Sequence, residues 1–159
     1  MISDDQFTRE TTALTPTLYR ISMSILRHEA DCRDAVQQAL LNVWAARGRL
    51  EETRFRSYLT RAVINECRNI QRKRMRETPI DEMPDIEYVM QPEQSELREA
   101  IDLLPESLRM PLLLHYMECF NEKETAAALG ITVVAVKNRL YRARKALKQQ
   151  LKDWEVAPQ

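Results

Sequence analysis

Apolar residues recur every three or four positions through most of residues 3–75, which is the spacing of one buried face of an α-helix. The pattern predicts a helix after Ser3, a residue type that caps helix N-termini, a second from Asp31 and a third over residues 54–75. No window alternates with period two, so these segments predict a helical bundle without strands. The apolar positions assigned to its interior are Phe7, Leu14, Leu18, Ile21, Ile25, Leu26, Ala35, Val36, Ala39, Leu40, Val43, Trp44, Tyr58, Leu59, Ala62, Val63 and Ile70.

A second helical pattern begins after residue 95. It predicts one helix in ELREAIDLL, another opened by Pro105 with Glu106, and two more capped by Asn121 and Thr132. Pro111 is compatible with the helix that starts at Glu106 only if it lies near the first turn.

The last two expected helices have the spacing of a helix-turn-helix. Ala126 is small enough for the two helices to cross closely, Gly130 permits the sharp turn, and the β-branched Val136 anchors the second helix. A helical wheel places Val133, Val136, Leu140, Ala143, Leu147 and Leu151 on one side of the second helix and Lys137, Asn138, Tyr141, Arg142, Lys145 and Lys148 on the other.

Between the two patterns lies the segment ETPIDEMPDIEYVMQPEQS, Glu77–Ser95, which has no helical period and holds three of the seven prolines. Proline blocks helix continuation, and like charges extend a chain, so this segment is expected to be an acidic linker. The fold class is therefore expected to be all-α: two small helical domains over residues 1–76 and 96–159, joined by an acidic, proline-containing linker over residues 77–95, with the helix-turn-helix in the second domain.

The formal net charge is zero, but the charges are segregated along the chain. Residues 47–76 carry ten basic and three acidic side chains, residues 77–107 one basic and ten acidic, and residues 108–159 nine basic and five acidic. Two basic zones indicate contact with a polyanion at two places, although solvated helix faces are the usual explanation of a charge run. The glycine turn before the last helix of the second basic zone favours a recognition helix, whose Lys and Arg neutralise phosphates while Asn and Arg read base edges.

Composition argues against an enzyme, a membrane protein and a secreted protein. Two glycines are too few for a phosphate-binding loop, the apolar runs are too short to span a bilayer, and three scattered cysteines suit the reducing cytoplasm. His28 with Cys32, and His115 with Cys119, have a possible metal-ligand spacing, but a zinc site needs four ligands and only Cys67 remains. No catalytic residue, metal or other cofactor is expected.

Two blocks of sequence then resemble a known family. The run LPESLRMPLLLHYMECFNEKETAAALGITVVAVKNRLYRARKALKQQL is similar to the promoter-binding domain of extracytoplasmic-function sigma factors, which belong to the sigma-70 family. DAVQQALLNVWAARGRL with FRSYLTRAVINECRNIQRKRMRE is similar to their other domain, which binds core RNA polymerase and opens the promoter. The resemblance covers nearly the whole chain and implies a transcription initiation factor.

The resemblance also implies partners and site residues. Core polymerase would be bound through its β′ clamp helices and β flap, promoter DNA is the second partner, and an anti-sigma factor is expected as a regulator. The linker would follow a basic channel of polymerase. The residues implied are Asp34, Gln37, Gln38 and Asn42 for the clamp; Arg54, Arg56, Arg61, Asn65, Arg68, Asn69 and Arg72 for the melted downstream element; and Lys137, Asn138, Tyr141, Arg142 and Lys145 for the upstream element.

Four positions differ from the family pattern. Tyr58 stands where Trp is frequent and is expected to remain an aromatic core anchor; Val134 and Ala135 replace a common Gly-Thr pair, and Gln38 replaces a frequent acidic residue.

Two other functions fit part of the pattern. One is an operator-binding regulator that uses the same helix-turn-helix; the other is a sigma-like adaptor that binds a partner without promoter activity. Neither explains the basic third helix with Asn65 and Asn69, which are four residues apart and therefore share a face.

Overall fold

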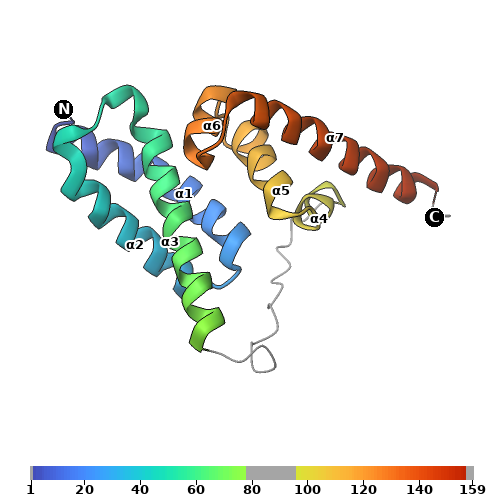
Figure 1. Ribbon diagram of the computed structural model, residues 1–159, viewed down its shortest axis with the longest axis horizontal. Helices are drawn as coiled ribbons and strands as arrows, with labels where there is room; N and C mark the ends of the chain where they lie inside the picture. Colours follow the sequence, from blue (N-terminus) through green and yellow to red (C-terminus); the bar gives the residue numbers. More distant parts are fainter. Residues whose placement is uncertain (1, 78–95, 157–159) are drawn as a thin grey trace. The chain divides into compact units, whose positions relative to one another are not determined.

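The computed structural model describes the backbone of residues 2–77 and 96–156, with side chains to residue 152. Helices α1, α2 and α3 belong to one compact unit, and α4, α5 and α7 to a second (Figure 1). The described residues are helical or form turns between helices, as the all-α prediction required. The expected linker, apart from Glu77, lies outside the described residues. Across the described ranges, every helix is too short or too polar to cross a membrane.

The first unit is a three-helix bundle in which each helix packs against the other two. It consists of α1 (Asp4–Leu26), α2 (Glu29–Ala46) and α3 (Phe55–Glu77), with short 3₁₀ helices η1 (Arg47–Arg49) and η2 (Glu52–Arg54) between α2 and α3. Ser3 caps α1 as predicted: its hydroxyl accepts the amide of Gln6 at 3.2 Å, and the Gln6 side chain accepts the Ser3 amide at 3.1 Å. The second helix begins two residues before the predicted Asp31, with His28 in the N-cap position.

The aromatic core of this unit is organised around Phe55 rather than Tyr58. Phe55 is completely buried at the start of α3 and packs edge to face on Phe7, with ring centroids 5.6 Å apart; Phe7 packs in the same way on Trp44 at 4.9 Å. Tyr58 is 44% exposed, so its prediction as a core anchor was wrong.

The error on Tyr58 comes from two small polar residues that α3 buries. Ser57 and Thr60 are buried alongside Leu59, and the Thr60 hydroxyl is satisfied inside the helix by the Arg56 carbonyl at 2.8 Å. A hydroxyl bonded in this way can be buried at little cost. The side of α3 that is buried therefore differs from the side that its apolar residues alone indicate. Tyr58 lies opposite the buried side and is exposed.

The second unit packs α4 (Glu96–Asp102), α5 (Glu106–Leu112) and α7 (Val133–Val156) around one core. The π-helical turn η4 (Leu113–Met117) follows α5, and α6 (Glu122–Leu129) contributes Ala126 to the core. Buried Arg109 holds the α4–α5 turn, because its guanidinium donates to the Leu104 carbonyl at 2.7 Å. The core residues are Ala100, Ile101, Leu104, Leu112, Ala126, Val136, Leu140, Ala143 and Leu147.

Pro111 is the sixth residue of α5 and so lies beyond the first turn, contrary to expectation. Proline has no amide hydrogen to donate to the carbonyl four residues earlier, and α5 ends one residue after it. The chain continues as a π-helical turn, closed by the Glu118 amide on the Leu113 carbonyl at 3.0 Å. His115 Nδ1 lies 2.8 Å from the Phe120 carbonyl, which fixes the turn before α6.

Arg27 ends α1 in the left-handed conformation, with φ of 56°. A β-carbon is strained in that region whereas glycine is not, so Arg27→Gly is expected to raise the free energy of unfolding by about 0.5–1 kcal/mol. Urea denaturation measures the change. Arg27→Ala is the control, since it removes the guanidinium but keeps the β-carbon; equal stability of the two variants would show that left-handed strain is not the cause.

Candidate nucleic-acid interface

The helix-turn-helix is built by local hydrogen bonds at both of its N-caps. Asn121 caps α6: its side chain accepts the Glu124 amide at 2.7 Å, and the Glu124 carboxylate accepts the Asn121 amide at 3.0 Å. Thr132 caps α7 by accepting the Ala135 amide at 3.1 Å. Gly130 between the helices has φ of 69°, which glycine adopts without strain. Both predicted caps and the glycine turn are confirmed.

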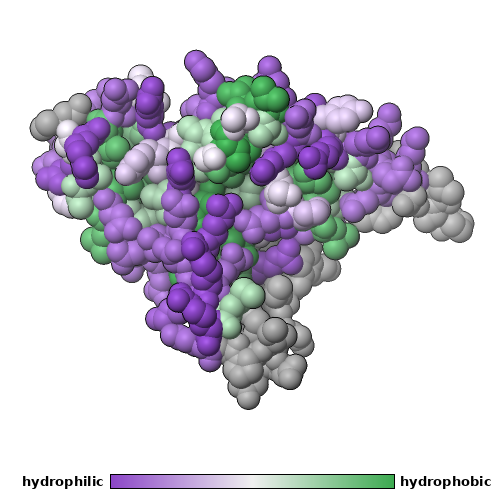
Figure 2. Space-filling model, in the orientation of Figure 1, coloured by the Kyte–Doolittle hydropathy of each residue, from purple (hydrophilic) through white to green (hydrophobic). Residues whose placement is uncertain are grey.

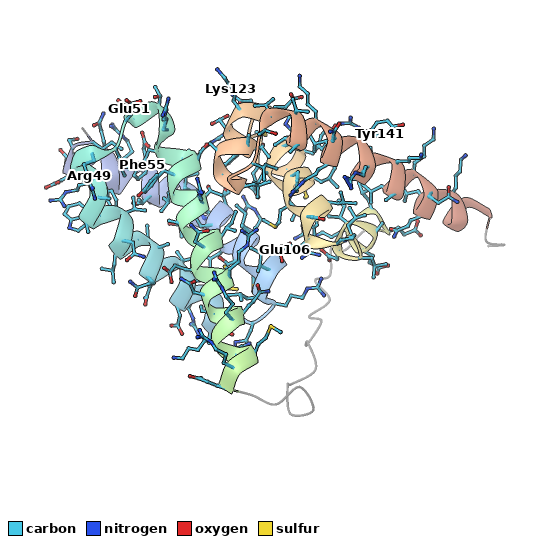
Figure 3. The ribbon with its side chains drawn as sticks, viewed as in Figure 1. Arg49, Glu51, Phe55, Glu106, Lys123 and Tyr141 are labelled. Atoms are coloured by element: carbon cyan, nitrogen blue, oxygen red, sulfur yellow. The ribbon has the colours of Figure 1, made fainter. Side chains whose placement is uncertain are left out.

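The second helix of this motif presents one continuous exposed face that is mostly polar. Its opposite side is buried in the core of the unit, as the helical wheel predicted. Lys137 also lies 3.7 Å from Glu122 of α6, an ion pair between the two helices of the motif that is exposed and therefore weak. The structure brings all the predicted upstream-element residues together as exposed side chains on α7: Lys137, Asn138, Tyr141 (labelled in Figure 3), Arg142 and Lys145.

A second polar face runs along α3. Arg72 Nη2 donates to Asn69 Oδ1 at 3.2 Å, so the amide oxygen of Asn69 is engaged within the face. Figure 2 shows largely hydrophilic residues along the exposed length of α3. The predicted downstream-element residues gathered on this face are Arg61, Asn65, Arg68, Asn69 and Arg72, and all are exposed.

Two other predicted downstream-element residues lie apart from this face. Arg54 belongs to η2, where it is exposed and lies 3.7 Å from Glu51. Arg56 is half-buried and, by helical phase, projects from the opposite side of α3.

Tyr58 lies at the N-terminal end of the α3 face, by the same helical phase that places Arg61 and Asn65 there. An exposed aromatic ring among cationic and amide side chains is a platform on which an unpaired base can stack. The sequence carried a signal for this placement, since Tyr58, Arg61, Asn65 and Asn69 follow one another at intervals of three or four residues.

The predicted polymerase-binding residues also share one face, on α2. Asp34, Gln37, Gln38 and Asn42 are exposed there. Gln38 donates to Asn42 at 3.0 Å, and Asn42 donates to the Glu66 carboxylate of α3 at 3.1 Å, which holds these amides in place. Leu41, which the prediction omitted, is 63% exposed in their midst. An exposed leucine surrounded by polar groups is compatible with the apolar core and polar rim of a protein interface.

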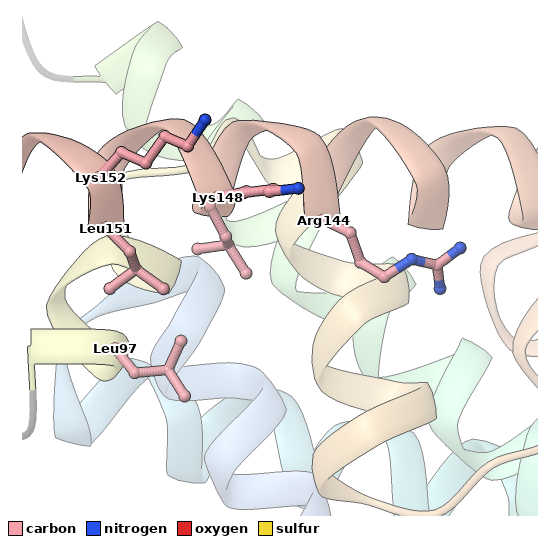
Figure 4. Close-up of a pocket in the computed structure, with 6 residues that line it drawn as sticks. Leu97, Arg144, Lys148, Leu151 and Lys152 are labelled. Atoms are coloured by element: carbon pink, nitrogen blue, oxygen red, sulfur yellow. The ribbon is translucent and has the colours of Figure 1, made fainter.

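A shallow groove of about 400 Å³ lies between α4 and the C-terminal part of α7 (Figure 4). Leucines from both helices form its apolar surface and three cationic side chains line it. The lining residues are Leu97, Arg144, Leu147, Lys148, Leu151 and Lys152. The Arg144 guanidinium also contacts the hydroxyl of Tyr116 by a hydrogen bond.

The ionisable groups suit binding better than catalysis. Burial raises the pKa of the Cys32 thiol to about 11, so the thiol is uncharged and unreactive near neutral pH. Burial and the nearby Glu52 carboxylate raise the pKa of Glu10, which lies outside every face described above. Within residues 2–77 and 96–152 there is no group of three or more His, Cys, Asp or Glu side chains placed to hold a metal ion.

Known proteins match both units. The family model for Sigma-70 region 2 matches residues 12–77, and the one for Sigma-70, region 4 matches residues 94–147. The RNA polymerase sigma-E factor of Streptomyces avermitilis is 28% identical over 145 residues, covering 87% of this chain and 81% of its own. RNA polymerase sigma factor SigV of Bacillus subtilis is 28% identical over 142 residues, covering 84% and 83%.

Solved structures show the same architecture. The sigma factor RpoE of Bartonella quintana, in complex with the anti-sigma factor NepR, matches with a TM-score of 0.78 and 25% identity over 96% of this chain and 98% of its own. CnrH, in complex with the cytosolic domain of CnrY, matches with a TM-score of 0.68 at 22% identity over 95% and 90%, which bears on the fold alone.

Proposed function

Because this chain belongs to the extracytoplasmic-function group of the sigma-70 family, and is thus an RNA polymerase sigma factor rather than an enzyme, we propose that its two units act on different parts of a promoter. Residues 1–76 bind core polymerase and the melted downstream element; residues 96–159 bind the upstream element as duplex. The observation that carries this division is the pair of exposed, amide-containing cationic faces, one in each matched region.

The face of α7 is suited to duplex DNA. A major groove admits one α-helix, and the exposed side of α7 offers both kinds of contact that recognition requires. Lys137 and Lys145 neutralise phosphates, whereas Asn138 offers a donor with an acceptor and Arg142 offers paired donors, and such pairs distinguish bases. The caps at Asn121 and Thr132 fix the two helices of the motif, so this face is presented in one orientation.

The face of α3 is suited to a separated strand. Unpaired bases expose hydrogen-bonding edges and ring faces that a duplex hides, and capture of such a strand needs cationic tracking, polar groups and an aromatic platform. Arg61, Arg68 and Arg72 follow the backbone, Asn65 and Asn69 bond base edges, and Tyr58 stacks on a base. Since Arg72 holds the Asn69 oxygen, Asn69 acts chiefly as a donor through its amide nitrogen.

The α2 face is the proposed docking surface for the β′ clamp helices. Leu41 supplies the apolar centre, and Asp34, Gln37 and Gln38 form a polar rim. Asn42 is braced by Glu66, so its contribution depends on α3 as well as on α2.

The groove between α4 and α7 is the proposed site for the β flap. Its leucines offer apolar area, while Arg144, Lys148 and Lys152 favour a partner with acidic groups beside its apolar ones. A regulatory anti-sigma factor is a further proposed partner, supported by the anti-sigma factor NepR in the complex of the structural relative RpoE.

Transcription by core polymerase from a promoter library, with and without this protein, tests the proposal. Promoter-dependent transcripts are expected only when the protein is present. Absence of stimulation on every template would refute the function. Specific duplex binding without polymerase would instead favour an operator-binding regulator, and polymerase binding without promoter-dependent transcription would favour an adaptor.

A further inference from the structure

Val134 is an exposed apolar side chain in the first turn of α7. It is 67% exposed, although valine is usually buried. Val134, Asn138, Tyr141 and Lys145 follow the spacing of one helix face, so Val134 lies on the same face as the upstream-element residues. Its neighbours one turn along that face are Lys137 and Asn138, both exposed.

The first turn of α7 holds Val134 in this position. Thr132 caps the helix through the Ala135 amide, and Val133 is partly buried against the core of the unit. These contacts fix the rotation of the first turn of α7 about the helix axis. Valine is branched at its β-carbon and has one strongly preferred rotamer in a helix, so its methyl groups lose little freedom on binding.

The chemistry of the major groove narrows what Val134 can contact. In a helix-turn-helix the N-terminal residues of the recognition helix approach the base edges. Among the groups displayed there, the C5-methyl of thymine is the apolar one, while the others donate or accept hydrogen bonds. A valine placed against a donor or acceptor would desolvate it without replacing its hydrogen bond.

We propose that Val134 selects an A·T base pair within the upstream element by packing against the thymine methyl group. This inference rests on the proposed function, because it requires α7 to enter the groove. It adds a base preference that phosphate-binding lysines cannot provide.

Replacing thymine by deoxyuridine removes that methyl and leaves the pairing edges unchanged. Each thymine of an upstream element, on both strands, is replaced singly, and closed-complex affinity of the reconstituted holoenzyme is measured by band shift. One position is expected at which the wild-type protein loses about three- to fivefold in affinity, as removal of one buried methyl implies. Val134→Ala is expected to bind more weakly and to lose that sensitivity to deoxyuridine.

Leu103→Ala is the matched control, because Leu103 is 72% exposed in the α4–α5 turn, away from the α7 face. It is expected to keep the full deoxyuridine effect. Thermal unfolding of each variant checks that it folds; if Val134→Ala does not, Val134→Thr takes its place, with a reduced deoxyuridine effect expected from its single methyl.

Deoxyuridine insensitivity of the wild-type protein at every position would overturn the inference, as would an undiminished effect in the Val134 variant. If promoter binding is otherwise normal, either result refutes the contact between Val134 and the thymine methyl but leaves the proposed function intact. If holoenzyme does not recognise the upstream element at all, it is the proposed function that fails.

Discussion

Replacing Asn65 and Asn69 together by alanine is expected to slow promoter opening by roughly 30-fold while duplex binding at the upstream element stays unchanged. Both asparagines are exposed on α3 and are four residues apart, so they can bond neighbouring bases of one strand. If each lost contact costs about 1 kcal/mol, the pair costs about 2 kcal/mol, which corresponds to that rate. The loss falls on opening because those base edges are available only after the strands separate.

Permanganate footprinting follows the opening step, and a template with a pre-melted bubble provides the decisive comparison. The defect should shrink on the bubble, since the energetic cost of separating the strands has been removed. Lys73→Ala is a suitable control: it removes an exposed charge from α3 that is not among the proposed strand contacts, and opening should remain near the wild-type rate. A defect of equal size on both templates would place the asparagines in another step.

Replacing Asn138 and Arg142 together by alanine should weaken the closed complex by at least about 30-fold and leave opening competent once the complex has formed. Each lost base contact typically costs about 1–3 kcal/mol and relaxes the preference at the base pair it reads. Because the loss occurs before strand separation, a pre-melted bubble should not restore affinity. Band shifts on a set of single-base variants of the upstream element measure both effects.

Arg144→Ala offers a matched comparison on the same helix. Arg144 has the same charge as Arg142 and lies two residues further along, but its guanidinium is bonded to the Tyr116 hydroxyl and lines the groove facing α4. Its removal should leave base preference unchanged. Should Arg144→Ala blur that preference as strongly as the double variant, general charge rather than base reading would explain the behaviour of α7.

The helix-turn-helix was predictable from sequence because every feature of it is local. Asn121 and Thr132 cap the helices that follow them, Gly130 adopts positive φ between them, and the apolar spacing of α7 sets its buried side. Each of these depends on residues within one or two turns of the chain. The upstream-element residues were therefore placed on one exposed face before any packing was known.

The features that sequence reasoning missed depend on packing between helices. Leu41 is as hydrophobic as the adjacent Leu40, and only the packing of α2 on its neighbouring helices leaves the Leu41 side chain exposed. Arg56 has the same charge as Arg61, yet the first turn of α3 directs it to the opposite side and leaves it half-buried. Charge and hydropathy do not distinguish such residues.

Local sequence was thus sufficient to determine the helical class, the turn chemistry and the face of α7, because caps, glycine and helical period act within a few residues. Tertiary packing decided which aromatic of α3 became the core anchor. Phe55 fills the space beside Phe7, and Ser57 and Thr60 accompany it inside, which turns Tyr58 outward onto the cationic face. The physical reason is that a small hydroxyl bonded to its own helix is cheap to bury, so the apolar residues of one helix do not alone set the side that its neighbours cover.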